Sequence, residues 1–169
     1  MPSGTSLSAL LRYEQCRMLG IMPEAVMLAA GSGGTHAGWL LGTRALGSPW
    51  RLESFTVSRE SEPVCLQIAH LATESAALLG LNWCFNSKEV VVHDGFIGAG
   101  YGIPSPEAAA SIRLLARSEG VLLDPTYTGK AMAGLLEHLR CGLAPYRSLV
   151  FLHTGREPAF FAGDGEWLA

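Results

Sequence analysis

Short apolar runs alternate with stretches of helical periodicity from one end of the chain to the other. Residues 25–30 and 149–152 are continuously apolar, as expected for strands that are buried on both faces of a parallel sheet. Residues 51–57 alternate in polarity and are rich in strand-forming residue types, so they predict a further strand. Weaker strand signals cover residues 82–93 and 121–123.

Apolar residues at helical spacing fill the intervals between these runs. They predict helices over residues 6–19, 36–46, 61–79 and 105–119, and a last helix that Gly142 ends. Strands separated by helices, without Asn-Gly hairpin turns, predict an α/β fold in which helices cover both faces of a parallel sheet. No linker or internal repeat interrupts the pattern, so residues 1–169 are interpreted as a single domain.

The composition narrows the class of protein. Of the 169 residues, 49% are hydrophobic and 16% are charged, which excludes a disordered chain and is enough for a sizeable core. No apolar run approaches the roughly 20 residues that a bilayer requires. The first residues carry neither the basic nor the apolar region of a secretory signal, so we expect a cytoplasmic protein without a membrane partner. A net charge of -3 with scattered cations argues against nucleic acid.

The cysteines give no sign of a metal site. Cys16, Cys65, Cys84 and Cys141 are far apart in the sequence and lack the spacing of a zinc ligand set. We expect them to be buried free thiols, because free cysteine packs as a small hydrophobic side chain.

The glycine-rich turn after the first predicted strand is the strongest candidate for chemistry. The turn, Gly31-Ser32-Gly33-Gly34-Thr35, precedes a helix, whose free N–H groups and positive end attract an anion such as phosphate. A tight turn without a ligand is the alternative. A dinucleotide fingerprint would need glycine where His36 stands, and a Walker loop would need a nearby lysine, so both of these interpretations are weakened.

Three further segments have the composition of ligand-binding loops. Tyr101 stands among glycines in residues 98–102, residues 124–130 combine a proline turn with Tyr127, and residues 152–155 end the chain's last strand. Each is as compatible with capping as with catalysis. Because ligands bind at the carboxyl ends of parallel strands, we expect these segments to form one pocket together with the glycine-rich turn.

The four motifs, taken in order, resemble one family. They read Gly-Ser-Gly-Gly-Thr-His-Ala-Gly (31–38), Gly-Tyr-Gly-Ile-Pro (100–104), Leu-Leu-Asp-Pro-Thr-Tyr-Thr-Gly-Lys-Ala-Met (122–132) and His-Thr-Gly (153–155). The sequence is similar to the D-cysteine desulfhydrase and 1-aminocyclopropane-1-carboxylate deaminase family. These are pyridoxal 5'-phosphate enzymes of the tryptophan-synthase-β-like fold, so the resemblance implies a three-layer αβα domain.

The resemblance implies a role for each matched residue. Cofactor-binding residues would be Ser32, Gly33, Gly34, Thr35, Thr128 and Thr154. The first four would hold the cofactor phosphate, and Thr154 would face the pyridine nitrogen, which a neutral hydroxyl leaves less protonated than a carboxylate would. Tyr101 and Tyr127 match the family's active-site tyrosines, which assist proton transfer. Thr128 stands where the deaminase branch carries glutamate, which favours the desulfhydrase branch.

The sequence departs from the family pattern in its lysines. The family's Schiff-base lysine lies in an N-terminal half that has no counterpart here, and the two lysines present, Lys88 and Lys130, are poor substitutes. Arg156 replaces a second glycine after His-Thr-Gly. Residues 1–6 resemble an internal family segment, so we expect a truncated chain that is the C-terminal portion of the large cofactor-binding domain.

The implied reaction is β-elimination from D-cysteine or a related small amino acid, which yields pyruvate, ammonia and sulfide. Whether this chain acts as an enzyme is left open, because without the lysine-bearing half we expect it to be inactive alone. A partner chain supplying that half and homo-oligomerisation are both expected, since the missing half would cover apolar surface. The alternatives are a non-catalytic cofactor- or phosphate-binding remnant and a deaminase-like protein.

Overall fold

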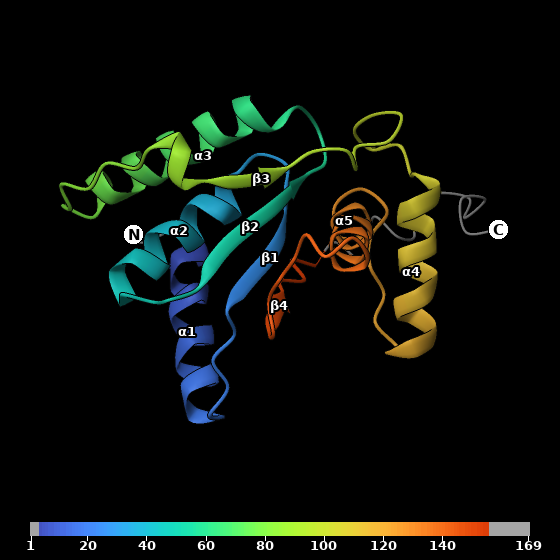
Figure 1. Cartoon of the computed structure of the whole chain (residues 1–169). Helices are drawn as coiled ribbons and strands as arrows, with labels where there is room; N and C mark the ends of the chain where they lie inside the picture. The colour runs from blue at the N-terminus through green and yellow to red at the C-terminus, as the bar shows by residue number, and fades with distance from the viewer. Residues whose placement is uncertain (1–3, 156–169) are drawn as a thin grey trace.

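A four-stranded parallel sheet forms the centre of the computed structural model, which describes residues 4–155. The strands are β1 (Ala25–Ala30), β2 (Arg51–Thr56), β3 (Val91–His93) and β4 (Leu149–Phe151), and they lie in the order β3-β2-β1-β4 (Figure 1). All pairings are parallel, with β1 at the centre between β2 and β4. The carboxyl ends of β1, β2 and β4 therefore meet at one edge of the sheet.

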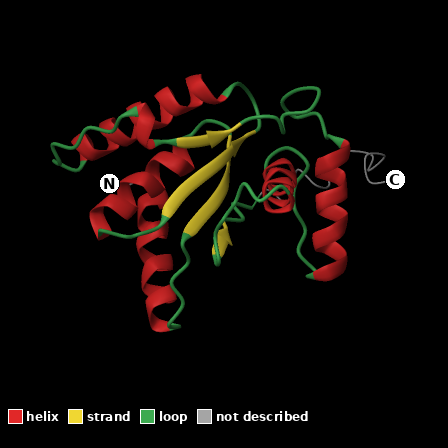
Figure 2. Ribbon diagram, in the orientation of Figure 1, coloured by secondary structure: helices red, strands yellow, loops and turns green. Residues whose placement is uncertain are grey.

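Helices cover both faces of the sheet, as the sequence predicts, and give three layers (Figure 2). Contacts join α2 (Gly34–Leu46) to β1, β2 and both of its helical neighbours, α1 (Gly4–Met18) and α3 (Ser61–Leu78). On the opposite face, α5 (Thr128–Arg140) contacts β1 and β2 and is backed by α4 (Pro106–Ser118). A single 3-10 turn (Ser87–Glu89) precedes β3.

The sheet separates the core into an α5 side and an α2 side. Phe55, Met27 and Leu123 meet Ala131 and Leu135 on the α5 side. On the other face, one cluster joins α2 to α3 and a second joins α2 to α1 around two stacked tryptophans, whose ring centroids lie 6.1 Å apart. Strand β1 is buried along its whole length, which explains its uninterrupted apolar sequence.

Helix α5 packs directly on the ring of Phe55 at a glycine. A Cβ atom built on Gly134 would overlap the ring of Phe55 on β2. Phe55 also packs edge-on against His138, one turn further along the helix. The absence of a side chain at position 134 therefore sets the distance between α5 and the strands beneath it.

Two predicted strand segments differ in the structure. Residues 121–123 form no strand: Leu123 is buried in the α5-side core, and the Leu122 carbonyl accepts a hydrogen bond from the imidazole of His153 instead of from a neighbouring strand. The apolar character of this segment therefore reflects core packing and not sheet pairing. Of residues 82–93, only β3 pairs in the sheet.

The cysteines are free, as predicted, but they are not buried. Cys16 and Cys65 are half-buried, whereas Cys84 and Cys141 are exposed. Within residues 4–155, no group of histidine, cysteine and carboxylate side chains could hold a metal ion. None of the helices in this part of the chain has the length and apolar character needed to cross a membrane.

Candidate functional site

A cavity of about 270 Å³ lies where β1 passes into α2. Three segments that are far apart in the sequence contribute to it: the glycine-rich turn, the start of α5 and the segment after β4. Its lining residues are Ala29, Gly31, Ser32, Gly33, Thr35, His36, Tyr127 and Thr154. The turn, residues 124–130 and residues 152–155 therefore converge as predicted, whereas no residue of the segment 98–102 lines the cavity.

The glycine-rich turn presents unpaired backbone donors to this cavity. Gly33 is the N-cap of α2 and has a left-handed backbone with φ of 84°, and no side chain caps the helix. The first hydrogen bond of the helix runs from the N–H of Ala37 to the carbonyl of Gly33, at 2.9 Å. The N–H groups of Gly34, Thr35 and His36 consequently have no acceptor within the helix, and the helix dipole adds partial positive charge there.

Gly31 and Gly33 are both required by close contacts, and Gly33 is required by its backbone shape as well. A Cβ on Gly33 would lie 2.8 Å from Cγ1 of Ile68 in α3, and its left-handed φ disfavours other residues. A Cβ on Gly31 would lie 2.7 Å from Cε1 of Tyr127. The ring of Tyr127 therefore packs directly over the backbone of the turn.

Tyr127 is held in place by the carboxylate of Asp124. This buried carboxylate accepts hydrogen bonds from the backbone N–H groups of Thr126, Tyr127 and Thr128 at 2.8–2.9 Å. Asp124 thus closes the free N-terminal end of α5, where a negative charge is also favoured by the helix dipole. The sequence motif contains this cap, but its function becomes evident only in the structure.

Thr128, which the resemblance assigns to the cofactor, is turned away from the cavity. Its side chain is completely buried, its hydroxyl donates to Oδ1 of Asp124 at 2.7 Å, and the same hydroxyl accepts from the Asp124 N–H at 2.9 Å. The hydroxyl of Thr128 is therefore engaged in the cap of α5.

The two predicted active-site tyrosines meet. The hydroxyls of Tyr101 and Tyr127 form a hydrogen bond, and the rings pack edge to face with centroids 5.8 Å apart. Tyr127 lines the cavity, whereas Tyr101 is 55% exposed, does not line the cavity and contacts Tyr127 from the loop between β3 and α4. Because either phenol can donate, the pair can pass a proton between the two oxygens.

Thr154 is placed by its neighbour His153. Nδ1 of His153 accepts the N–H of Gly155 at 3.0 Å, so Nε2 carries the proton and donates to the Leu122 carbonyl at 2.8 Å. These two bonds anchor the segment after β4 at the mouth of the cavity. Arg156, which the sequence singles out next, lies outside the described residues.

His36 is a buried polar group that sequence reasoning considered only as a misfit to a dinucleotide motif. Burial lowers its pKa to about 4, so the ring is neutral at pH 7. Nδ1 shares a hydrogen bond of 2.9 Å with the Ser54 hydroxyl, and Nε2 has no partner among the described residues. Because the ring is neutral, the positive electrostatic field at the start of α2 comes from the backbone N–H groups and not from His36.

Neither lysine lies in the cavity. Lys88 is exposed in the 3-10 turn before β3. Lys130 is fully buried, and its ammonium group donates to backbone carbonyls of the loop that carries Tyr101. No residue of this sequence therefore offers a lysine amine to a ligand held by the glycine-rich turn.

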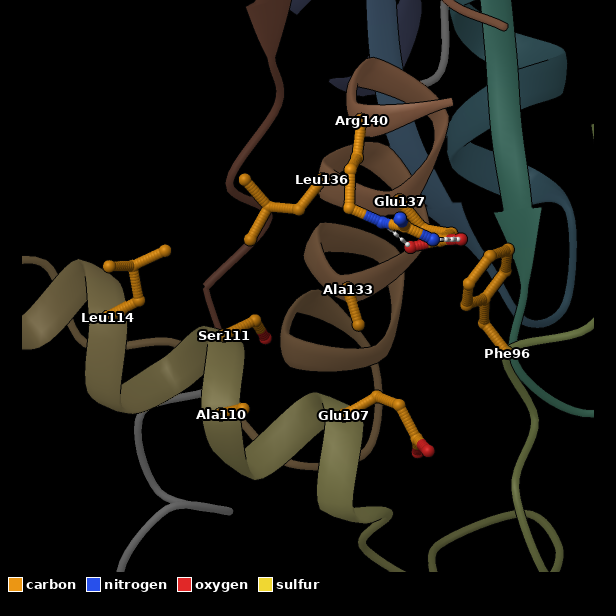
Figure 3. Close-up of a pocket in the computed structure, with 9 residues that line it drawn as sticks. All are labelled: Phe96, Glu107, Ala110, Ser111, Leu114, Ala133, Leu136, Glu137 and Arg140. Carbon is orange, nitrogen blue, oxygen red and sulfur yellow. Dashed lines mark hydrogen bonds and ion pairs between the residues drawn. The ribbon is translucent and has the colours of Figure 1, made fainter. Parts of the chain in front are cut away.

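A second cavity of about 360 Å³ lies between α4 and α5, and no predicted site residue lines it. Apolar side chains of both helices form most of its walls, while Glu137 and Arg140 pair with each other at one end and Glu107 stands at the other (Figure 3). Its polar groups do not converge on a common point, so it lacks the character of a catalytic site.

The fold and the first cavity define a class of protein that the family comparison identifies. Residues 3–155 match the model of the pyridoxal-phosphate dependent enzymes, and the chain belongs to this family. The backbone donors, the left-handed glycine and the free helix end fit the phosphate of that cofactor.

Among individual relatives, the chain is similar to a D-cysteine desulfhydrase of Yersinia enterocolitica, at 38% identity over 94% of this chain and 50% of the relative. A D-cysteine desulfhydrase of Yersinia pestis is 36% identical over the same shares. The chain thus spans about half the length of the curated relatives that it matches.

Solved structures agree with the assignment. An ACC deaminase homologue superposes with a TM-score of 0.76 at 33% identity and covers 92% of this chain, which spans 46% of that structure. A threonine deaminase of T.th. superposes with a TM-score of 0.60 at 15% identity, covering 91% of this chain and 57% of its own, and supports the fold alone. The tryptophan-synthase-β-like fold expected from the sequence is confirmed.

Proposed function

We propose that this chain is the cofactor-phosphate half of a pyridoxal-phosphate lyase that acts on D-cysteine or a related small amino acid. The single observation that carries the proposal is that the uncapped start of α2 meets Tyr127, which is hydrogen-bonded to Tyr101, at one cavity. The family reaction would be β-elimination that releases pyruvate, ammonia and sulfide. When bound, the cofactor supplies an electron sink for the pair left behind by the α-proton.

The chain's own residues would divide the work at this cavity. The turn formed by Ser32, Gly33, Gly34 and Thr35 would bind phosphate through backbone N–H groups, with the Thr35 hydroxyl adding a further bond. Thr154 would stand at the pyridine nitrogen. The Tyr101–Tyr127 pair would hold and move a proton at the phenolic oxygens, and the ring of Tyr127 would exclude water from the turn beneath it.

Thr128 bears on the choice between the two branches of the family. Its buried hydroxyl completes the cap of α5, an arrangement that places no carboxylate at this position. This supports a desulfhydrase over a deaminase, in which the resemblance expects glutamate. A 1-aminocyclopropane-1-carboxylate deaminase-like activity is the competing substrate assignment, and direct assay of both amino acids decides between them.

We further propose that the cofactor-holding lysine comes from residues outside this 169-residue sequence and that the chain alone is inactive. The placement of Lys88 and Lys130 away from the cavity supports this. The partner would be a chain that bears this lysine, and a further copy of the present chain could also associate with it. The complex would work in the cytoplasm. The described residues would form part of its large cofactor-binding domain.

The central experiment measures cofactor binding and turnover separately. The chain alone should bind pyridoxal 5'-phosphate in equilibrium dialysis, but borohydride should fix no cofactor on Lys88 or Lys130, as read by mass spectrometry. Adding the N-terminal half of a D-cysteine desulfhydrase should restore sulfide release. Cofactor fixed on either lysine of this chain would contradict the proposed external lysine.

Gly33→Asp tests the phosphate assignment directly. A side chain at this position overlaps Ile68, and its carboxylate would repel a phosphate, so pyridoxal 5'-phosphate affinity should fall by roughly 100-fold or more. Gly47→Asp is the matched control, since Gly47 also has a left-handed φ, of 57°, but no atom within 4 Å of its Cβ position. Unchanged affinity in Gly33→Asp would remove the turn as the phosphate site.

A non-catalytic phosphate- or cofactor-binding protein is the second candidate. It is favoured by the absence of any lysine at the cavity, combined with an intact set of backbone donors at the helix start. Cofactor binding without sulfide release from D-cysteine, even when the lysine-bearing half is supplied, would support this candidate over the lyase.

A further inference from the structure

Lys130 occupies a place that is exceptional for a lysine. It lies in the first turn of α5, and no part of it is exposed to solvent. Its ammonium group donates hydrogen bonds to the carbonyls of Ile97, at 2.6 Å, and Gly100, at 2.8 Å. Both carbonyls belong to the loop between β3 and α4, so one side chain joins the start of α5 to a segment about 30 residues earlier.

Within residues 4–155, this ammonium group has no counter-ion. No carboxylate of the described residues forms an ion pair with Lys130. Burial alone lowers its pKa from the usual value. Because burying a charge without an ionic partner is costly, the two carbonyl bonds must offset that cost, and they do so only while the loop keeps its shape.

The loop has few other attachments near the tip that carries Tyr101. Ala99, Tyr101, Gly102 and Ile103 are all exposed, and the loop's own backbone bond, from Ile103 N–H to the Gly100 carbonyl, is long at 3.3 Å. Gly98 and Gly102 have left-handed backbones, a conformation that glycine adopts without strain. Both carbonyls that accept from Lys130 precede Tyr101 in the sequence, and that of Gly100 is immediately before it.

Tyr127 and Lys130 are fixed by the same helix start. Tyr127 is the N-cap residue of α5 and Lys130 is its third residue. The hydroxyl of Tyr127 bonds to that of Tyr101, while the ammonium of Lys130 holds the backbone immediately before Tyr101. The start of α5 therefore contacts Tyr101 at its side chain and holds the chain beside it.

We propose that Lys130 is a positioning residue that fastens the 97–101 loop to α5 and so sets the Tyr101 phenol against Tyr127. Its significance for turnover rests on the proposed lyase function, whereas its effect on the loop does not. The role differs from cofactor attachment, because the amine is committed to backbone carbonyls and lies apart from the residues that line the phosphate cavity.

The presence of only two lysines makes the contact measurable in the unmodified chain. In a chain labelled with ¹⁵N at the lysine Nζ, NMR should show one slowly exchanging ammonium signal for Lys130 and none for exposed Lys88. The Lys130 signal should correlate across hydrogen bonds with the Ile97 and Gly100 carbonyl carbons. Equally fast exchange of both ammonium groups would overturn the proposal, and this arm needs no variant to fold.

Lys130→Met tests the consequence for the loop, with Lys88→Met as the matched control. Amide hydrogen exchange over residues 97–103 and chymotryptic cleavage after Tyr101 should each accelerate at least tenfold in Lys130→Met only. Lys130→Arg, which keeps the donors, should recover part of the protection. Unchanged exchange and cleavage in a folded Lys130→Met chain would contradict the proposal.

Turnover provides the last readout. With the lysine-bearing half supplied, Lys130→Met should lower kcat for sulfide release at least tenfold while KM and pyridoxal 5'-phosphate affinity of the chain stay within twofold. If the unmodified chain did not bind pyridoxal 5'-phosphate, the proposed function would be rejected, but the loop measurements on Lys130 would still stand. An unchanged kcat would show that Lys130 does not position Tyr101 for the reaction.

Discussion

At the scale of single residues, burial controls the charge of His36. The ring sits 1% exposed at the start of α2, and its pKa falls from 6.5 to about 4 because desolvation disfavours the charged form. The unfolded chain therefore binds a proton on this histidine at a higher pH than the folded chain does. Stability from this group is fully present above pH 6.5 and is lost as the pH falls towards 4.

His36→Gln should remove this component of acid sensitivity. The free energy of unfolding of the unmodified chain should drop by roughly 3 kcal/mol more than that of His36→Gln between pH 7 and pH 4, from the linkage of a pKa shift to stability. Urea denaturation at the two pH values measures the difference. His70→Gln, at an exposed histidine, should retain the full acid sensitivity, and an equally acid-sensitive His36→Gln would contradict the assigned cause.

Residue-scale contacts also explain what sequence reasoning could and could not find at the site. The glycine-rich turn, Tyr101, Tyr127 and Thr154 can be proposed as candidates from the sequence because each lies in a short motif whose composition is itself informative. The carbonyl bonds of Lys130 and the proton position on His153 depend on partners about 30 residues away. Nothing in the local pattern encodes such partners, and Thr128 cannot be distinguished by sequence from a cavity-facing hydroxyl.

At the scale of elements, the N-terminal caps of α4 and α5 differ in how many hydrogen bonds they make. Asp124 binds three backbone N–H groups and one hydroxyl at the start of α5, whereas Ser105 binds one backbone N–H at the start of α4. The same kind of cap is thus present in a strong and a weak form on neighbouring helices. The strong form belongs to the helix that carries Tyr127.

Asp124→Ala should destabilise the chain by about 3 kcal/mol, because it removes a buried charged acceptor from several donors at once. Ser105→Ala should cost about 1 kcal/mol, as is usual for a single N-cap. Chemical denaturation gives both values, and Tyr127 amide exchange should rise only in Asp124→Ala. Equal costs for the two substitutions would show that the extra bonds of Asp124 contribute little.

Periodicity predicts the elements wherever burial and backbone pairing coincide. Strand β1 and the helices follow their apolar patterns closely, since each buries the face that its sequence marks. The strand predicted over residues 121–123 is wrong because Leu123 is buried without its backbone joining the sheet. The hydrophobic pattern indicates which side chains are buried. It does not indicate whether the backbone has a neighbouring strand with which to form sheet hydrogen bonds.

At the scale of the whole molecule, the β4 side of the sheet is open in the described part of the chain. Strand β4 pairs only with β1, and all three of its residues are partly exposed. Leu122, next to His153 beyond this strand, is 42% exposed, and Leu143 in the preceding segment is 62% exposed. Exposed apolar side chains beside the unpaired edge of a strand are typical of a surface that another chain covers.

Leu122→Lys should weaken association of the chain, with itself or with a lysine-bearing half, by roughly tenfold or more, because a charge would enter the covered surface. Leu78→Lys is the control, since Leu78 is 84% exposed at the end of α3, which packs against α2 on the side of the sheet opposite to α5. Sedimentation velocity over a concentration series measures both variants. A chain that stays monomeric and binds no lysine-bearing half would contradict the predicted interface.

The glycine at position 134 has a consequence for how the site tolerates change. Tyr127 precedes Gly134 by seven residues, which places its backbone two helical turns, or about 10 Å, along the axis from the point where α5 rests on Phe55. If a side chain at position 134 pushed α5 away from Phe55, the helix would tilt and its first residues would move. We therefore expect any side chain at position 134 to shift Tyr127, the Asp124 cap and the contacts of Lys130 together. Such a substitution would perturb the candidate site although position 134 does not line its cavity.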